Sequence, residues 1–544
     1  MSPFRSTSRR ATAVAAAALF ALSLGACAAI PAEGTGEQLE GGTIRYAHLQ
    51  EPPCVFGGWI QQAYLSRQVL DSLVTQTEDG EIVPWLATDW EVSDDQKVYT
   101  FTLKDGVSFT DGTPVDAQAI VDNFEYWVAG GNSTVTAYIE NYYESSRAID
   151  ATTFELTLTK PYSPLLSVIT QAYFGIQSPA SLERSAEEQC DQPIGSGPFI
   201  VGDWKRGENI SFSRNDDYNS APATAKHEGP AYVDSIVWSF LADPTTRYGS
   251  LLSGESDVVY DIPSVNWVQA GEQFERLQYI TPGRPDVMTF NTSQGVFSDE
   301  LLRKAFTYSL DRKTIVDSVF NGAALYEPNG AVSQSTPGYD ASIADDYSQD
   351  LDKANDLLDE AGWTETDDEG YRTKDGAVLE VRIPVTTGSI LTQEGATVLQ
   401  IVQQQAREVG FKVTLIPVTQ SELFSGAYST VDAYDISVGY WTAPTAGIMY
   451  INFRQNLPES PNYWNGAFYN NPELEAIIVQ ANSTLDKTEQ DALYAKAQQI
   501  ISDHAVAIGL YTQTTTLAIS RSLKDVWLEA SQGEPVLSDA YFVG

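Results

Sequence analysis

The chain has 544 residues, and its 73 acidic and 32 basic residues give a formal net charge of −41 at pH 7. A chain of this length exceeds what one hydrophobic core organises, so at least two domains are expected. So acidic a surface argues against a nucleic-acid-binding function, which needs a basic patch, and against polyanionic ligands.

The N-terminal residues 1–27 are typical of a processing segment and are set apart from the fold. Three arginines precede an alanine-rich apolar stretch over 11–24, which is shorter than the about 20 residues of a membrane span. The stretch ends in Leu-Gly-Ala-Cys at Cys27, which is similar to a bacterial lipobox. We therefore expect lipidation of Cys27, which would anchor the protein to the outer face of the cell membrane, and a flexible tether over 28–40. Export by the Sec route is favoured over the twin-arginine route.

Two further cysteines, Cys54 and Cys190, remain if Cys27 is lipidated. An even number of cysteines in an exported protein predicts a disulfide, because disulfides persist outside the cell. The alternative interpretation is a pair of buried thiols. Closing so long a loop would stabilise the fold by about 4–5 kcal/mol in the chain-entropy model.

Residues 84–127 carry strand, turn and helix signals in a fixed order. Apolar and polar residues alternate over 98–104, which predicts a half-buried strand, and two Asp-Gly turn dipeptides follow it. Thr113 then predicts a helix N-terminus, with Pro114 at the first helical position and Asp116 in the first turn.

The second half of the chain alternates strands and helices. After a helix capped by Asp311, the pattern predicts a strand over 378–385, a helix over 391–409 and a strand over 411–418. Two strands joined by a long helix predict a parallel pair with a right-handed crossover. A further strand is predicted over 433–440, and the fold class is α/β.

Segment 84–127 resembles the family 5 extracellular solute-binding proteins, the peptide- and nickel-binding receptors of ABC importers. The family pattern there runs PxLAxxW, then an acidic turn, then TFxLRxGVxFxDGxP. Four more segments resemble the family: PIGSGPF at 193–199, DPTTR at 243–247, NTSQGVFSDELLRKAFTYSL at 291–310 and DLDKANDLLDEAGW at 350–363. The resemblance spreads over most of the chain.

The resemblance implies a two-lobed periplasmic-binding-protein-like fold with a hinge, in which a ligand binds in the cleft between two α/β lobes. By this comparison, lobe I comprises residues 41–285 and 509–544, with an extra subdomain over about 79–190, and lobe II comprises 286–508. The implied function is capture of a small solute and its delivery to an ABC permease with its ATPase subunits, by a receptor that we expect to be monomeric.

The resemblance places ligand groups in three segments: the loop after a first strand at 43–47, a loop of the extra subdomain, and the segment after strand 433–440. Candidate ligand-binding residues in and near them are aromatic or neutral: His48, Gln50, Tyr173, Phe174, Tyr440, Trp441, Thr442 and Trp464. Such a lining suits peptides, amides or sugars. Phe174 and Trp464 fit a core position equally well, and His48 fits an ordinary loop histidine.

Peptides are the expected solute class. Peptide-binding relatives place an Asp after this strand to pair with the α-amino group, and this chain has none between Ile436 and Glu459. An oligosaccharide or a metal chelate therefore stays an alternative. The three histidines have no metal-ligand spacing, so we predict neither a directly bound metal nor a cofactor. A secreted hydrolase is the rival class, but G-x-S-x-G and H-E-x-x-H motifs are absent, so we predict no enzymatic activity.

Overall fold

The computed structural model describes most of the chain: residues 36–544 without 344–345, 387–390 and 420–421. The predicted processing segment and Cys27 lie outside the described residues, as does most of the predicted tether. The described end of the tether is exposed, and Gln38 forms a β-bridge with Val543. Within the described ranges, no helix is both long enough and apolar enough to span a bilayer.

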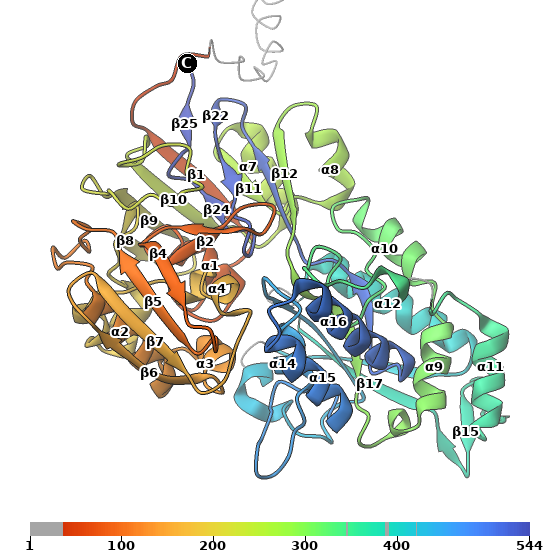
Figure 1. Cartoon of the computed structure of the whole chain (residues 1–544). Coiled ribbons are helices and arrows are strands. Elements are labelled where there is room, and N and C mark those ends of the chain that lie inside the picture. The colour runs from red at the N-terminus through yellow and green to blue at the C-terminus, as the bar shows by residue number, and fades with distance from the viewer. Residues whose placement is uncertain (1–35, 344–345, 387–390, 420–421) are drawn as a thin grey trace, which may run out of the picture.

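Lobe I is built on a seven-stranded sheet with the strand order β12-β21-β11-β1-β10-β9-β8 (Figure 1). The central strand β1 pairs in parallel with β10 on one side and β11 on the other. Ile44 and Tyr46 of β1 are buried because alternate residues of a strand point to the same face. The strand bounds are β1 (Thr43–His48), β8 (Phe199–Lys205), β9 (Asn209–Arg214), β10 (Ser235–Phe240), β11 (Val258–Tyr260), β12 (Glu275–Ile280) and β21 (Thr514–Ile519).

A four-stranded antiparallel sheet, β4-β5-β7-β6, forms a separate layer beside this one, with α2 (Ala117–Tyr126) packed against β6 and β7 (Figure 1). The predicted strand over 98–104 is confirmed as β5, in which Tyr99, Phe101 and Leu103 are buried. The bounds are β4 (Ala87–Val92), β5 (Val98–Leu103), β6 (Tyr143–Ala148) and β7 (Thr153–Leu158).

The start of α2 differs from the prediction, which placed the cap at Thr113. Asp116 is the N-cap, and its carboxylate accepts a hydrogen bond from the backbone N–H of Ala119 at 2.9 Å. Thr113 is held instead in the preceding turn, where its hydroxyl donates to Asp111 at 2.6 Å. Pro114 forms a bridge with Ser108, so this stretch stays extended until Asp116.

Lobe II contains the three-stranded sheet β19-β13-β20 and the pair β17–β18. The predicted parallel pair is confirmed by the register of β17 with β18, which α12 connects. The bounds are β13 (Gly283–Phe290), β17 (Glu380–Val385), α12 (Gln393–Glu408), β18 (Lys412–Pro417), β19 (Ile436–Thr442) and β20 (Ala507–Tyr511).

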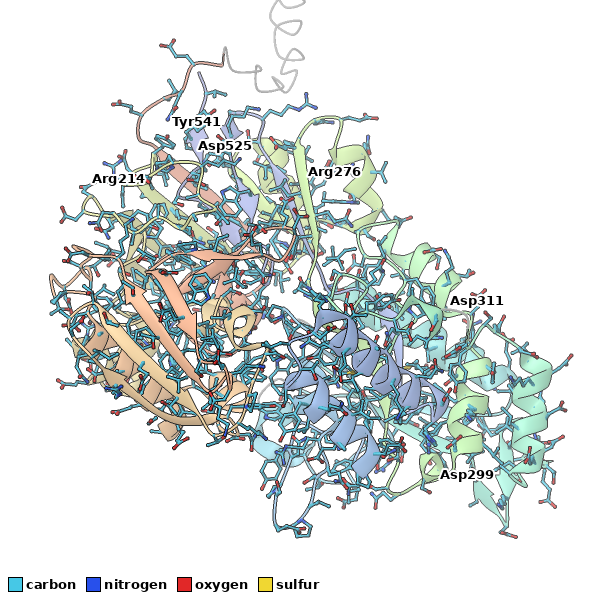
Figure 2. The ribbon with its side chains drawn as sticks, in the orientation of Figure 1. Arg214, Arg276, Asp299, Asp311, Asp525 and Tyr541 are labelled. Carbon is cyan, nitrogen blue, oxygen red and sulfur yellow. A yellow bond between two sulfur atoms is a disulfide. The ribbon has the colours of Figure 1, made fainter. Side chains whose placement is uncertain are left out.

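Helices cover the lobe II sheet, and their starts carry acidic caps. Asp311 caps α10, as predicted, by accepting from Thr314 N–H at 3.1 Å, and Asp299 caps α9 by accepting from Leu301 N–H at 2.9 Å (Figure 2). The bounds are α9 (Glu300–Tyr308), α10 (Arg312–Phe320), α11 (Leu351–Glu360), α14 (Ile448–Phe453), α15 (Pro472–Asn482) and α16 (Lys487–Asp503).

The chain passes between the two sheets at two adjacent points. β12 belongs to the lobe I sheet and β13 to the lobe II sheet, while β20 returns to lobe I as β21. The two passages lie side by side, because Thr281 N–H donates to the carbonyl of Gln513 at 2.9 Å. We propose these passages, residues 281–282 and 512–513, as the hinge; the boundaries expected from sequence lie inside β13 and β20.

Candidate ligand site between the lobes

A cavity of about 390 Å³ lies between the lobes. Lobe I contributes residues 58–60, Ser133, Thr134 and Tyr173 to its lining, and lobe II contributes residues of β13, β17, β19 and neighbouring loops. Pockets of a few hundred Å³ at domain interfaces are the usual place for small ligands. Among the predicted site residues, the cavity brings together Tyr173, Tyr440, Trp441, Thr442 and Trp464.

Aromatic side chains form one wall of the cavity. The rings of Trp441 and Trp464 meet edge to face with centroids 4.7 Å apart, and the Trp441 indole N–H donates to the Tyr138 hydroxyl at 3.2 Å. Trp441 and Tyr440 belong to β19 itself, which extends beyond the end expected at residue 440. The strand continues because Gly283 and Arg284 of β13 pair with Thr442 and Trp441.

Thr442 joins the two lobes at the base of the cavity. Its hydroxyl lies 3.1 Å from the Tyr173 hydroxyl and accepts from the Gln532 side-chain amide at 3.0 Å. Its carbonyl accepts from the Tyr138 hydroxyl at 3.0 Å. Phe174, next to Tyr173, is buried outside the lining, where its ring packs against Trp127 at 5.4 Å.

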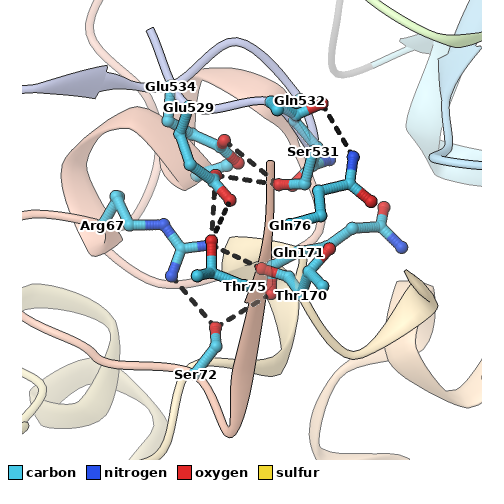
Figure 3. A network of polar contacts seen from close by, with 12 residues as sticks. Arg67, Ser72, Thr75, Gln76, Thr170, Gln171, Glu529, Ser531, Gln532 and Glu534 are labelled. Carbon is cyan, nitrogen blue, oxygen red and sulfur yellow. Dashed lines mark hydrogen bonds and ion pairs between the residues drawn. The ribbon is translucent and has the colours of Figure 1, made fainter. Parts of the chain in front are cut away.

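A buried polar network fixes the segment that carries Gln532. The Arg67 guanidinium donates to Ser72 at 3.0 Å and to the Thr170 carbonyl at 2.7 Å, and it approaches Glu529 at 3.5 Å (Figure 3). Burial beside Glu529 raises the pKa of Glu534 well above its usual value. The contact from Gln532 to Thr442 therefore comes from a segment held in place by several buried hydrogen bonds.

His48 and Gln50 lie outside the cavity lining. His48 is the last residue of β1, so its ring points into the lobe I core, 4.5 Å from the Tyr260 ring and 5.9 Å from that of Trp238. Burial lowers the pKa of His48 to about 3. The carbonyl of Gln50 lies 3.2 Å from His48 Nδ1, so the Gln50 backbone contacts the histidine ring and does not face the cavity.

The loop after β1 reaches the cavity later than expected, at Gly58, Trp59 and Ile60. Earlier in this loop, Cys54 forms a disulfide with Cys190 of the extra subdomain, and the two Cα atoms are 4.6 Å apart. Gly58 packs so closely on the extra subdomain that a Cβ atom there would lie 2.1 Å from the Thr134 hydroxyl. The Gly57-Gly58 pair is the sequence signal for this close approach, because glycine lets backbones meet.

Arg284 of β13 also lines the cavity, and sequence analysis missed it. It is an arginine within a strand that is otherwise mostly buried, Gly283–Phe290, and this contrast is the signal that could have found it. Among the residues that the structure describes, no group of three or more His, Cys, Asp or Glu is placed to hold a metal ion.

Comparisons with known proteins agree with these features. The family model of the bacterial extracellular solute-binding proteins, family 5, matches residues 81–456. The glutathione-binding protein GsiB of Shigella dysenteriae is 27% identical over 459 residues, which cover 82% of this chain and 84% of the relative.

Solved structures share the fold. NikA from Brucella suis in complex with Fe(III)-EDTA superposes with a TM-score of 0.79 at 23% identity, covering 92% of this chain and 99% of that one. The oligopeptide-binding protein AppA from Bacillus subtilis, in complex with a nonapeptide, gives a TM-score of 0.77 at 20% identity over 93% and 100% of the two chains. The predicted two-lobed α/β fold class is thus confirmed.

Proposed function

Because the chain belongs to the bacterial extracellular solute-binding proteins of family 5, we propose that it captures a small solute of the peptide class between its lobes and delivers it to a membrane permease. Membership of this family makes it a solute-binding component of an ABC importer and not an enzyme, acting outside the cytoplasm. The observation that carries the proposal is the cavity of about 390 Å³ with an aromatic wall between the lobes.

The lining supports a peptide as the solute class. Tyr440, Trp441 and Trp464 offer flat apolar area for side chains, and the hydroxyls of Ser133 and Thr134 can hydrogen-bond amide groups. AppA, of the same fold, is in complex with a nonapeptide. NikA is in complex with Fe(III)-EDTA, so a metal chelate is the second candidate, with an oligosaccharide as the third.

Capture depends on closure of the lobes. A solute that touches both lobes only in the closed form stabilises that form, and the closed receptor then docks on the permease. Contacts outside the cavity support a closed arrangement: the backbone N–H and the hydroxyl of Ser163 donate to the carbonyl of Asn482 at 2.8 and 3.0 Å. Release would follow when ATP hydrolysis in the transporter reopens the lobes.

Attachment to the membrane through lipid on Cys27 completes the proposal, with the receptor acting as a monomer. Replacing Cys27 with Ala is expected to move the protein from the membrane fraction to the medium, which fractionation and immunoblotting measure. Continued membrane binding of an unlipidated Cys27→Ala protein would contradict the anchor. A Cys54→Ala variant, still lipidated, is the control for loss of a cysteine.

Thermal-shift screening tests the solute class. Peptides, oligosaccharides and metal chelates are added separately, and a solute bound in the cleft raises the melting temperature by mass action. We expect the largest shifts from peptides. A screen in which chelates or sugars alone raise the melting temperature would replace the peptide class, and one without any shift would contradict the receptor function.

A further inference from the structure

Arg284 stands apart chemically from the rest of the cavity. Of the described residues that line it, Arg284 alone carries a formal charge, while the others are aromatic, aliphatic, glycine or neutral hydroxyl residues. The described lining thus offers a positive group and no carboxylate. A solute with a negative group would find a partner there, and a solute with an ammonium group alone would not.

The strand pairing fixes where this charge sits. β13 is the central strand of its sheet, with β19 and β20 on either side, and Arg284 lies directly opposite Trp441 of β19. Residues opposite one another in an antiparallel pair project to the same face with Cβ atoms about 5 Å apart. The guanidinium and the indole therefore face the same solute.

The fold leaves this guanidinium without a protein partner. Within the described residues, the Arg284 guanidinium donates no hydrogen bond and has no carboxylate within the 4.0 Å of an ion pair, and its Nε is buried without an acceptor. The guanidinium groups of other buried arginines donate to carbonyls, even where an Nε has no acceptor, as in Arg67 and Arg312. Arg247 donates to the carbonyls of Tyr260 and Asp261, and Arg303 donates to that of His504. A buried donor without a partner is costly, which points to a partner supplied from outside.

The neighbouring acid forms no ion pair with this guanidinium. Asp286 lies two positions along the strand, and its carboxylate is not within the 4.0 Å of an ion pair with Arg284. Burial raises the pKa of Asp286 well above its usual value, while the Arg284 charge acts in the opposite direction. Burial also lowers the pKa of Arg284 to about 10, so the guanidinium stays protonated at neutral pH. The cavity therefore keeps a positive charge that its own lining does not offset.

We propose that Arg284 binds a carboxylate of the solute, so that this receptor selects solutes with a carboxylate and does not require a free α-amino group. This inference rests on the proposed function and narrows its substrate class. The guanidinium presents a planar fork of N–H donors that matches a carboxylate in a two-pronged contact. The carboxylate of a peptide C-terminus, of a uronate sugar or of a chelator offers the same chemistry.

Matched pairs of probes separate the carboxylate from the solute class. The pairs are N-acetyl-Ala-Phe-Ala and its C-terminal amide, digalacturonate and galactobiose, and Ni(II)-EDTA and Ni(II)-triethylenetetramine. Affinity for the mature full-length protein is measured by isothermal titration calorimetry at pH 7. We expect at least one acid probe to bind, and its partner without the carboxylate to bind about ten-fold more weakly or worse.

Variants then assign the preference to Arg284. Arg284→Gln is expected to bind the acid probe as weakly as the probe without the carboxylate, and Arg284→Lys to keep part of the preference. Arg147→Gln is the charge-matched control, because Arg147 lies on the surface in a pair with Glu155 and should keep the full preference. Melting temperatures of all variants show that the fold is retained.

The outcomes of these experiments distinguish the role of Arg284 from the receptor function on which it rests. Equal binding of both members of a pair, or an unchanged preference in Arg284→Gln, would overturn the role of Arg284 and leave the receptor function standing. Binding of a solute without a carboxylate while every acid probe fails would overturn it as well. Failure of every solute in both screens would count against the receptor function itself.

Discussion

Trp441 combines three contacts at the centre of the site. It pairs through its backbone with Arg284, packs edge to face on Trp464, and donates its indole N–H to Tyr138 of the opposite lobe. Large, fixed aromatic side chains of this kind contribute heavily to binding energy, because they bury much apolar area and lose little conformational entropy.

Trp441→Ala is expected to weaken solute binding more than ten-fold, about 1.4 kcal/mol or more, measured by calorimetry with the best solute of the thermal-shift screen. Trp90→Ala, which changes a partly buried tryptophan of β4 outside the cavity lining, is the control and should bind like the wild type. An unchanged affinity in Trp441→Ala would remove this residue from the site.

His48 gives the protein an acid-sensitive point away from the cavity. Its pKa is lowered from 6.5 to about 3 by burial among aromatic rings, and its Nε2 has no hydrogen-bond partner. The folded state therefore favours the neutral ring. The stability that this confers is fully present above pH 6.5 and is lost as the pH falls toward 3.

His48→Phe is expected to lose less stability than the wild type between pH 7 and pH 4, by on the order of a few kcal/mol, in urea unfolding curves. Tyr46→Phe alters the same aromatic cluster without removing a group that titrates in this range, and should keep the wild-type slope. Parallel pH profiles for His48→Phe and the wild type would contradict this reasoning.

Side-chain direction explains why sequence analysis named Trp441, which lines the cavity, and missed Arg284, which lines it as well. The resemblance to the family indicated that the segment containing Tyr440 and Trp441 carries ligand groups. Whether a residue at a strand end points to the core, as His48 does, or to a cavity, as Arg284 does, depends on the packing of segments far apart in the chain. The direction of such a side chain is therefore a property of the tertiary structure, and no local sequence pattern encodes it.

At the scale of elements, the segment between β1 and α1 (Ile60–Ser66) carries lobe I residues to the cavity. The Cys54–Cys190 disulfide bonds this segment to α6 (Ala186–Asp191), and Val55 N–H donates to the Cys190 carbonyl at 2.8 Å. The position of Gly58 against Thr134 depends on this attachment.

Replacing Cys54 and Cys190 together with Ser is expected to lower the free energy of unfolding by about 2–5 kcal/mol, because the unfolded chain gains freedom. Solute affinity should fall as well, since residues 58–60 lose their fixed attachment. Urea unfolding and calorimetry measure the two effects. Wild-type protein treated with a thiol reductant should behave like the double variant, and unchanged stability in both would contradict the expectation.

Elements with strong periodicity were predictable, whereas their ends were less so. The alternation in β5 and the strand–helix–strand order around α12 located these elements to within a few residues. The start of α2 was misplaced because Thr113 has two competing uses, as a cap and as a turn residue, and its hydrogen bond to Asp111 selects the turn.

At the scale of the whole molecule, contacts outside the cavity help to hold the lobes together. Besides the two hydrogen bonds from Ser163 to the Asn482 carbonyl, the Gln490 side chain donates to the Ser163 hydroxyl at 2.8 Å. Ser163 precedes α4 (Leu165–Val168) on one side of the cleft, and Asn482 ends α15 on the other. These contacts act on closure without touching the solute.

Ser163→Ala is expected to favour the open form and weaken solute binding by about two- to ten-fold, since it removes two side-chain hydrogen bonds across the lobes. Small-angle scattering of the free protein should show a larger radius of gyration, and the solute should dissociate faster. Ser146→Ala, which breaks a hydroxyl contact with Tyr143 inside one sheet, is the control. Identical scattering and affinity in Ser163→Ala would contradict this account of closure.

The two-lobed architecture came from the family resemblance, because periodicity alone gives elements and not their arrangement. The passages between sheets are set by which strands pair, and paired strands such as β11 and β21 are hundreds of residues apart in sequence. No local signal marks such a pairing.

The position of β21 in its sheet affects the order in which the two lobes can fold. β21 (Thr514–Ile519) lies between β12 and β11, so two neighbouring strands must wait for a partner that is synthesised late. The lobe II strands β13 to β20 fall within one continuous stretch. Lobe II can therefore fold before the C-terminal strand is available. The lobe I sheet closes last, so its strand edges stay unpaired longest, and this last stage of folding is when the chain is most exposed to aggregation and proteolysis.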